Sequence, residues 1–260
     1  MTKEDLLTQF FDLWNNVEFE NDQEMNLSFF SKAVNKYAEM NNQYVNIYSF
    51  KQKKILALSN NHKEVLGYDV SAEDYINNGK YYFVRDLPLV QSSIFLQFSY
   101  LYISKIKSYL KQSENVDNIY MYFHNFQLKH KNFTRHLGVY ATALNINQTK
   151  DIDLVLVINT DVSHLVKDPN LWWCNLSVEN ELHFSGHKDR LLVKEKHIFS
   201  KKEKDILTLL SIGKTTSEIL EELKITAPTL EKHRNNLLEW TGAKDISTLL
   251  QIVKYGNLLV

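Results

Sequence analysis

The stretch FSKKEKDILTLLSIGKTTSEILEELKITAPTLEKHRNNLLEWTG, residues 199–242, decides the fold of the C-terminal part of the chain, because it contains start and stop signals for three helices. Ser200 and Thr215 each precede a glutamate by three residues, which is the spacing of a helix capping box. Gly213 is suited to end the first helix, since a residue without a β-carbon adopts the left-handed conformation easily. Thr226 is a good N-cap for the third helix. Apolar residues recur at helical spacing behind each start, so the stretch predicts three short packed helices.

The third predicted helix, which starts near residue 227, has two chemically different faces. Its apolar face contains residues at i, i+7 and i+11, namely Leu230, Leu237 and Thr241. Its opposite face contains hydrogen-bonding side chains, namely Glu231, Lys232, Asn235 and Glu239. A short helix of this kind suits the major groove of DNA. The preceding helix ends only a few residues upstream, as a helix-turn-helix requires.

A set of residues in register carries a family resemblance, namely Ser200 to Leu207, Gly213, Ser217 to Ile219, Leu223 to Thr226, Thr229 to Leu237, and Gly242. These residues resemble the LuxR/GerE-type helix-turn-helix of bacterial transcription regulators. The resemblance implies a fourth helix, and Asp245 to Tyr255 offers an N-cap followed by apolar residues at helical spacing. We therefore expect an all-α, four-helix DNA-binding domain over residues 198–260.

Position on the third helix and the resemblance together predict nine DNA-binding residues. Those expected to meet base edges are Glu231, Lys232 and Asn235. Those expected to meet phosphates, or to hold the helix against the DNA backbone, are Lys214, Thr215, Ser217, Thr229, Arg234 and, between the two faces, His233. Glu231 departs from the family, which usually has lysine there; an acid repels phosphate but could accept a hydrogen bond from cytosine N4. Pro228 in the turn is also less usual, so the target sequence stays open. A packed helical domain that does not bind DNA is the alternative.

Charge is unevenly distributed along the 260 residues, whose formal net charge is −1. From Gly186 onward, 13 Lys and Arg stand against 10 Asp and Glu, a net of +3, so the preceding residues carry −4. The basic stretch 188–204 could approach phosphates beside the helix-turn-helix, or could be an ordinary solvated linker. The single cysteine, Cys174, excludes an internal disulfide and a cysteine-based zinc site, and fits a reducing cytoplasm.

No stretch indicates export or a membrane span. The N-terminal residues include acids and lack an unbroken apolar run, unlike a signal peptide. The most apolar run, from Ile94 to Ile106, is interrupted by polar residues, whereas a span needs roughly 20 mostly apolar residues. We therefore expect a cytoplasmic protein with no membrane partner.

Upstream of residue 198 the pattern predicts an α+β region. We expect helices at 4–19, 27–40, 60–68 and 89–111, and strands at 44–50, 55–59, 118–128, 133–146 and 152–159. This order, together with Leu66-Gly67-Tyr68, Asp86-Leu87-Pro88 and Asp161-Val162-Ser163, resembles a PAS domain. The resemblance implies a PAS-like sensor domain with a five-stranded antiparallel sheet over residues 42–165. N-terminal helices at 1–41 would precede it, and a connector at 166–197 would follow it. A generic α+β domain with the same sheet is the alternative.

Aromatic residues of the long helix and the next strand define a possible ligand pocket, namely Phe95, Phe98, Tyr102, Tyr120, Tyr122 and Phe126. The same aromatic stripe also suits a solid core. No metal site is predicted, because His124, His130 and His136 lack the spacing of a His-Glu-x-x-His helix or a Cys-x-x-Cys-His motif. Haem held by a single histidine leaves no such motif and stays open. No catalytic constellation is present, so we do not expect an enzyme.

These patterns predict a sequence-specific transcriptional regulator that binds double-stranded DNA as a homodimer. Its PAS-like domain would sense a small-molecule effector or mediate dimerisation. Apolar residues of the fourth helix could pair two chains, namely Leu249, Leu250, Val253 and Tyr255. The alternative is a signalling scaffold, whose PAS-like domain binds protein partners and whose helix-turn-helix does not bind DNA. The sequence does not indicate the promoter, the effector, or the direction of regulation.

Overall fold

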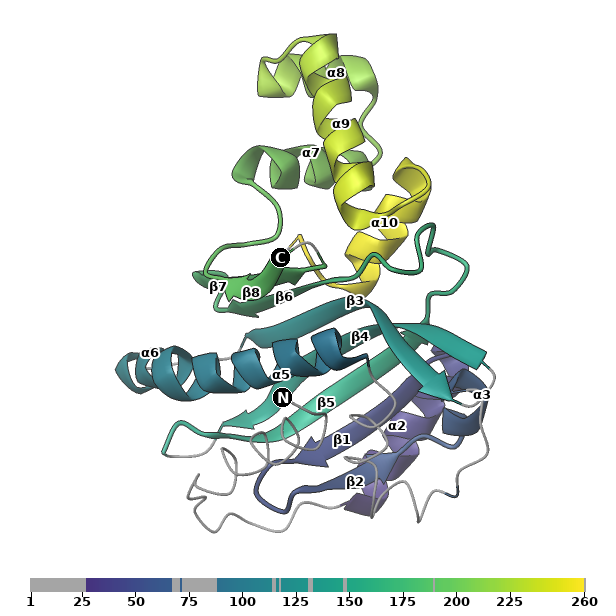
Figure 1. The fold of residues 1–260 in the computed structure, drawn as a ribbon, viewed down its shortest axis with the longest axis vertical. Helices are drawn as coiled ribbons and strands as arrows, with labels where there is room; N and C mark the ends of the chain where they lie inside the picture. The colour runs from purple at the N-terminus through teal and green to yellow at the C-terminus, as the bar shows by residue number, and fades with distance from the viewer. Residues whose placement is uncertain are drawn as a thin grey trace.

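The computed structural model describes residues 27–66, 71, 88–113, 116, 118–130, 133–146, 149–188 and 190–259. An antiparallel sheet with helices on both faces forms its larger part, and a group of four helices, α7 to α10, stands at one end (Figure 1). The helix predicted at 4–19 lies outside the described residues. Within the described ranges, no helix combines the length and the apolar character that a membrane crossing requires.

The sheet has eight strands in the order β2-β1-β5-β4-β3-β6-β7-β8. The strands are β1 (Tyr44–Ser49), β2 (Lys54–Leu58), β3 (Ile119–His130), β4 (Phe133–Ile146), β5 (Ile152–Asp161), β6 (Trp173–Val178), β7 (Leu182–His187) and β8 (Arg190–Lys194). The first five lie close to the ranges expected from the sequence. The prediction of a five-stranded PAS-like sheet is wrong in its strand number, because β6, β7 and β8 extend the sheet.

The three additional strands lie in the segment that we expected to be a connector. β6 adds to the edge of β3, with Phe123 opposite Cys174 and Tyr122 opposite Asn175. Within β6, successive side chains point to opposite faces, and both faces are covered, so β6 lacks the alternation of polar and apolar residues that marks a half-exposed strand. Its identity as a strand depends on pairing with distant β3, which local sequence does not reveal.

Helices cover the two faces of the sheet differently (Figure 1). On one face lie α3 (His62–Leu66), α5 (Leu89–Leu101), the π-helical turn η1 (Tyr102–Ile106) and α6 (Lys107–Gln112). Their apolar side chains form one cluster with Phe123, Phe126 and Val139. The long helix expected at 89–111 is therefore present, interrupted by one wider turn.

The other face of the sheet is covered at two places. The helix α2 (Leu27–Asn41) packs on β1 and β2 through Val34 and Ala38, in a cluster that also includes Leu154 of β5. The four-helix group packs on β3, β4 and β6. Tyr140 and Ile158 are opposite each other in the ladder of β4 and β5, so the two covered places share this face of the sheet.

The four-helix group consists of α7 (Lys201–Ser211), α8 (Thr216–Leu223), α9 (Ala227–Thr241) and α10 (Ile246–Tyr255). The predicted capping boxes are present: Ser200 caps α7 with Glu203, and Thr215 caps α8 with Glu218. Thr226 caps α9, and Asp245 caps α10. These starts could be predicted because a cap depends on residues within one helical turn.

The helical group and the sheet share one apolar cluster. Tyr122, Val162 and Trp173 from the sheet region lie in the same cluster as Leu237 and Val253 from the helices. Gly256, directly after α10, packs closely on Tyr122, since an added β-carbon would lie 2.7 Å from the ring. The two parts therefore pack through a shared apolar interior rather than through a few surface contacts.

Candidate nucleic-acid interface

The helix α9 has a buried side and an exposed side, as its sequence predicts. Leu230 and Leu237 are each 1% exposed and lie in the cluster shared with the other helices. Glu231, Lys232 and Asn235 are exposed. The three residues expected to meet base edges are thus on the surface, with polar groups that could donate to or accept from base edges.

The turn between α8 and α9 brings these two helices together. Lys224 ends α8 in the left-handed conformation, with a φ of 50°. Only Ile225 and the N-cap Thr226 then separate it from the first turn of α9. Pro228 stands in that first turn, where the missing N–H leaves no helical hydrogen bond unmade. The departure noted at Pro228 is therefore compatible with a regular start to α9.

Arg234 connects the exposed side of α9 to the start of α8. Its Nη2 donates to the hydroxyl of Thr216 at 3.3 Å, and its Nη1 lies 3.6 Å from the carboxylate of Glu231. Its side chain is only 17% exposed, whereas that of Glu231 is 62% exposed. Sequence reasoning missed Thr216, but the spacing of Glu231 and Arg234, i and i+3 on a helix, indicates their pairing.

The start of α8 is a second cluster of predicted site residues. Lys214 forms a salt bridge of 3.1 Å with Glu218, the residue that also accepts hydrogen bonds from Thr215 in the capping box. Hydrogen bonds from Thr215, followed by the Lys214 contact, lower the pKa of Glu218 to about 2. Ser217 is exposed in the first turn of the same helix. The backbone N–H groups of this turn and Lys214 could meet a phosphate together.

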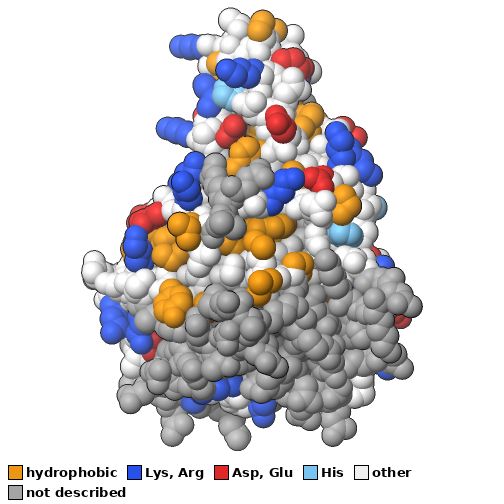
Figure 2. Space-filling model, in the orientation of Figure 1, with side chains coloured by type: hydrophobic (Ala, Val, Ile, Leu, Met, Phe, Trp, Pro, Cys, Tyr) orange, Lys and Arg blue, Asp and Glu red, His pale blue; other side chains and the backbone are white. Residues whose placement is uncertain are grey.

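The remaining predicted contacts lie between these two places. Thr229 is exposed, and its hydroxyl lies 2.9 Å from the hydroxyl of Thr226. His233 is half-buried in α9. Figure 2 shows Lys and Arg side chains along the helical part of the molecule, with Asp and Glu between them. The nine predicted residues thus occupy α9 and the start of α8, which the short turn holds next to each other.

The residues expected to line a ligand pocket do not share one space. Phe98 and Phe126 lie in the cluster on the α5 side of the sheet. Tyr122 lies in the cluster on the opposite side, beneath the helical group. Tyr120 stacks on Tyr140, with ring centres 6.0 Å apart. The side chains of Phe95 and Tyr102 lie outside the described part of the structure. The six residues therefore cannot all line a single pocket, because Tyr122 and Phe126 point to opposite faces of β3.

Comparison with known proteins gives a family match within the helical group. Residues 197–253 match the GerE family, described as bacterial regulatory proteins of the luxR family. No curated protein matches the chain.

Solved structures of VqmA proteins resemble the chain only weakly. A phage VqmA–DPO complex has 11% identity and a TM-score of 0.30, covering 88% of this chain and 90% of that one. VqmA bound to DPO has 14% identity and a TM-score of 0.27, covering 90% and 91%. A Vibrio cholerae VqmA dimer in the absence of target DNA has 14% identity and a TM-score of 0.29, covering 91% and 90%. TM-scores this low support no conclusion about this chain.

Proposed function

We propose that this protein is a transcriptional regulator that binds double-stranded DNA sequence-specifically, with α9 in the major groove. The observation that carries the proposal is the construction of α9 itself. Its apolar side is fully packed, its polar side is exposed, and α8 precedes it at the spacing of a helix-turn-helix. The match of residues 197–253 to the luxR family supports the same role.

Within this proposal the site residues have two functions. Glu231, Lys232 and Asn235 read base edges from the exposed side of α9. Lys214, Thr215, Ser217, Thr229, His233 and Arg234 contact phosphates or orient α9 against the DNA backbone. Arg234 is the best placed to orient α9, because it already joins this helix to Thr216 at the start of α8.

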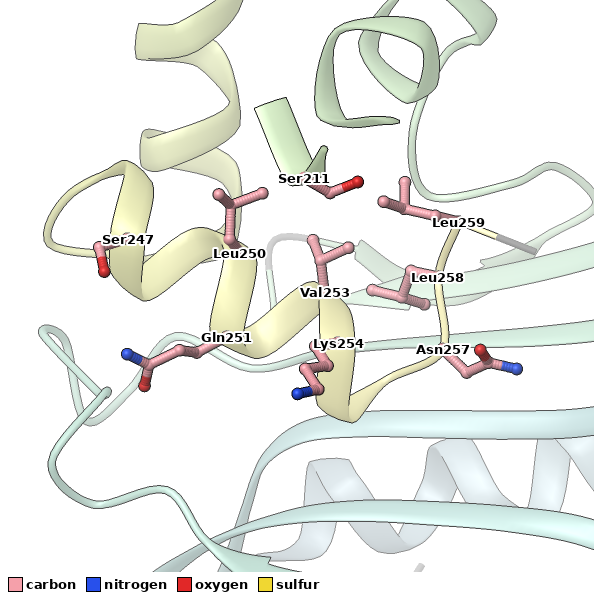
Figure 3. A pocket seen from close by; sticks show the side chains of 9 residues that line it. All are labelled: Ser211, Ser247, Leu250, Gln251, Val253, Lys254, Asn257, Leu258 and Leu259. Carbon is pink, nitrogen blue, oxygen red and sulfur yellow. The ribbon is translucent and has the colours of Figure 1, made fainter. Parts of the chain in front are cut away.

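A homodimer on DNA is part of the proposal, because one short helix contacts too few base pairs to specify a site, and regulators with this motif commonly pair half-sites. Two of the four residues expected to pair chains, Leu249 and Val253, are buried inside their own chain. Leu250 is half-buried and lines a groove of about 470 Å³ with Leu258 and Leu259 (Figure 3). We therefore propose that two chains pair through this groove. Leu250→Ser should then weaken DNA binding without unfolding the chain.

The sheet region, for which we retain the PAS-like assignment as a proposal, would sense a small-molecule effector or support dimerisation. Its support is the apolar cluster that the sheet shares with α9 and α10. A change in the packing of β3 or β6 would alter the packing of α9 and α10, because Tyr122 and Trp173 already contact the cluster that these helices form.

The decisive experiment is selection of randomised duplexes by the full chain, followed by binding measurements over a range of salt concentrations. A sequence-specific regulator should enrich one motif. The logarithm of its association constant for DNA should fall linearly with the logarithm of the salt concentration. Lys232→Ala should weaken binding to that motif, and Lys36→Ala, which removes an exposed lysine from α2, is the matched control. Absence of an enriched motif would favour the scaffold alternative, in which the four helices serve only for packing.

A further inference from the structure

Two histidines at the junction of the sheet and the helical group have no role in the proposed DNA contact. His183 lies in β7, and His197 lies in the segment that leads from β8 to α7. Their rings are perpendicular, and the ring centres are 4.8 Å apart. The pair therefore bridges the sheet edge and the chain segment that enters the helix-turn-helix.

Each ring has one nitrogen beside a backbone carbonyl oxygen and one buried nitrogen without a partner. His183 Nε2 lies 3.1 Å from the oxygen of Asn180, and His197 Nδ1 lies 3.2 Å from the oxygen of Phe199. Within the described chain, His183 Nδ1 and His197 Nε2 are buried and make no hydrogen bond. A histidine that binds a metal typically donates one ring N–H to a carbonyl and directs the other nitrogen at the ion.

The tautomer of His197 decides which nitrogen is available. The backbone N–H of Phe199 also lies 2.9 Å from His197 Nδ1, so this nitrogen accepts when the ring proton is on Nε2. When the proton is on Nδ1, it can be donated to the carbonyl of Phe199, and Nε2 becomes a free ligand. A metal ion would select this second tautomer.

Ligation of a metal requires neutral imidazoles, and the surroundings of both rings favour that form. Burial, followed by the nearby ammonium of Lys204, lowers the pKa of His183 and brings that of His197 to about 4. Lys204 therefore has two opposite effects on a cation at this place. It adds to the effect of burial in favouring the neutral rings, and it repels the cation directly.

Two further buried polar residues lie on segments next to the pair in the chain or in the sheet. Asn175 is 0% exposed and Ser185 is 1% exposed, and they are opposite each other in the ladder of β6 and β7. Asn175 Oδ1 accepts from the N–H of Ile198, the neighbour of His197, at 3.1 Å. Asn175 Nδ2 and Ser185 Oγ have no partner among the described residues. Buried polar atoms without partners normally bind water or an ion.

We propose that His183 and His197 bind one divalent transition-metal ion of the Zn²⁺ type, with water completing the coordination. Imidazole nitrogens suit Zn²⁺, Ni²⁺ and Cu²⁺. Two ligands at about 2.1 Å each need nitrogens within roughly 4 Å of each other, and the centres of these two rings lie 4.8 Å apart. In the part of the chain that the structure describes, no third His, Cys, Asp or Glu joins the pair. The ion would fasten the segment before α7 to β7.

The test is calorimetric titration of Zn²⁺ into the untagged, chelator-treated full chain. We expect one ion per chain for the wild type, and at least tenfold weaker binding for His183→Ala and for His197→Gln. Lys204→Gln should bind Zn²⁺ more tightly, because it removes the repelling ammonium. His164→Ala, which removes an exposed histidine elsewhere, is the control and should bind like the wild type.

Three outcomes would overturn the proposal. The first is that the wild type binds no Zn²⁺ at millimolar concentration. The second is that both histidine variants bind Zn²⁺ with the affinity of the wild type. The third is that His164→Ala loses binding. Circular dichroism shows whether each variant folds. If a histidine variant does not fold, Lys204→Gln still decides, since unchanged or weaker affinity in this variant contradicts a metal beside Lys204.

Discussion

At the scale of single residues, Glu231 has the most informative position, because its carboxylate can serve either Arg234 or DNA. The pair with Arg234 is an i and i+3 contact, a class that stabilises a helix by about 0.2–0.5 kcal/mol. For comparison, a good bidentate contact to a base discriminates against the wrong base by about 1–3 kcal/mol, and an acid can accept a hydrogen bond from cytosine N4. The carboxylate can therefore leave Arg234 when cytosine is opposite.

We expect Glu231→Lys to change the recovered motif at one base pair, because lysine prefers guanine to cytosine. Selection of randomised duplexes by the wild type and the variant measures this directly. Glu239→Lys adds the same charge to an exposed position later in α9 and is the control. Identical motifs, with higher affinity for all duplexes, would show that Glu231 does not read a base.

A second residue, His124, makes stability depend on pH. It is 2% exposed, stacks on Trp173 with ring centres 5.2 Å apart, and has its Nδ1 3.4 Å from the hydroxyl of Tyr122. Burial, followed by nearby His136, lowers its pKa to about 3. Between that value and the pKa near 6.5 of an unfolded histidine, the unfolded chain binds more protons. Stability must therefore fall as the pH falls through this window.

We expect His124→Gln to reduce the slope of the unfolding free energy against pH by the equivalent of up to one bound proton. The measurement is the free energy of unfolding in urea at several pH values between 7 and 4, where the slope against pH reports the difference in bound protons. His164→Gln, at an exposed position, should leave the slope unchanged. An unchanged slope in His124→Gln would mean that this ring binds its proton at the same pH in the native and in the unfolded chain.

At the scale of elements, each N-cap of the helical group should contribute a measurable amount to the free energy of unfolding. The hydroxyl of Ser200 accepts from the N–H of Glu203 at 3.3 Å at the start of α7. Ser200→Ala should cost about 1 kcal/mol of unfolding free energy, whereas Ser200→Gly should cost only a few tenths of a kcal/mol. Urea denaturation of both variants tests this order. A glycine variant as destabilised as the alanine variant would contradict this order, and would show that loss of the hydroxyl, which both variants share, sets the whole cost.

The same element scale explains which parts of the fold could be predicted from sequence. The starts of α7, α8 and α9 depend on Ser200, Thr215 and Thr226, whose partners lie within one turn, so their signals are local. The strand β6 was missed because it depends on pairing with distant β3 and is covered on both faces, and β7 and β8 were missed because they add in turn to β6 and β7. The sequence did not indicate the register shift after Phe123 in β3, which places Phe126 on the same side as Phe123, opposite Tyr122.

In the candidate site, too, some features could be predicted from local sequence and others could not. The exposed row of Glu231, Lys232 and Asn235 followed from helical periodicity. The contact of Arg234 with Thr216, and the pairing of His183 with His197, join segments whose approach depends on the complete fold. No spacing rule could have indicated either.

At the scale of the whole molecule, Trp173 holds the helical group to the sheet. It is fully buried, its Nε1 donates to the oxygen of Thr241 at the end of α9 at 3.3 Å, and its ring packs against Tyr122 and Phe199. Its neighbour Trp172 is also buried but lies on the opposite face, stacked on Phe123. The two tryptophans are therefore a matched pair, of which only one faces the helices.

We expect both Trp172→Ala and Trp173→Ala to cost about 3–5 kcal/mol of stability, since each removes a large buried ring. Only Trp173→Ala should make the helical group open independently of the sheet. Hydrogen exchange measures this, because amides that open together show the same free energy of protection. In Trp173→Ala the amides of α9 and α10 should exchange faster than those of β4 and β5, whereas in Trp172→Ala the two regions should weaken by equal amounts. Equal protection of both regions in Trp173→Ala would show that the shared cluster does not couple the helices to the sheet, and would remove the physical route by which an effector at the sheet could change DNA binding.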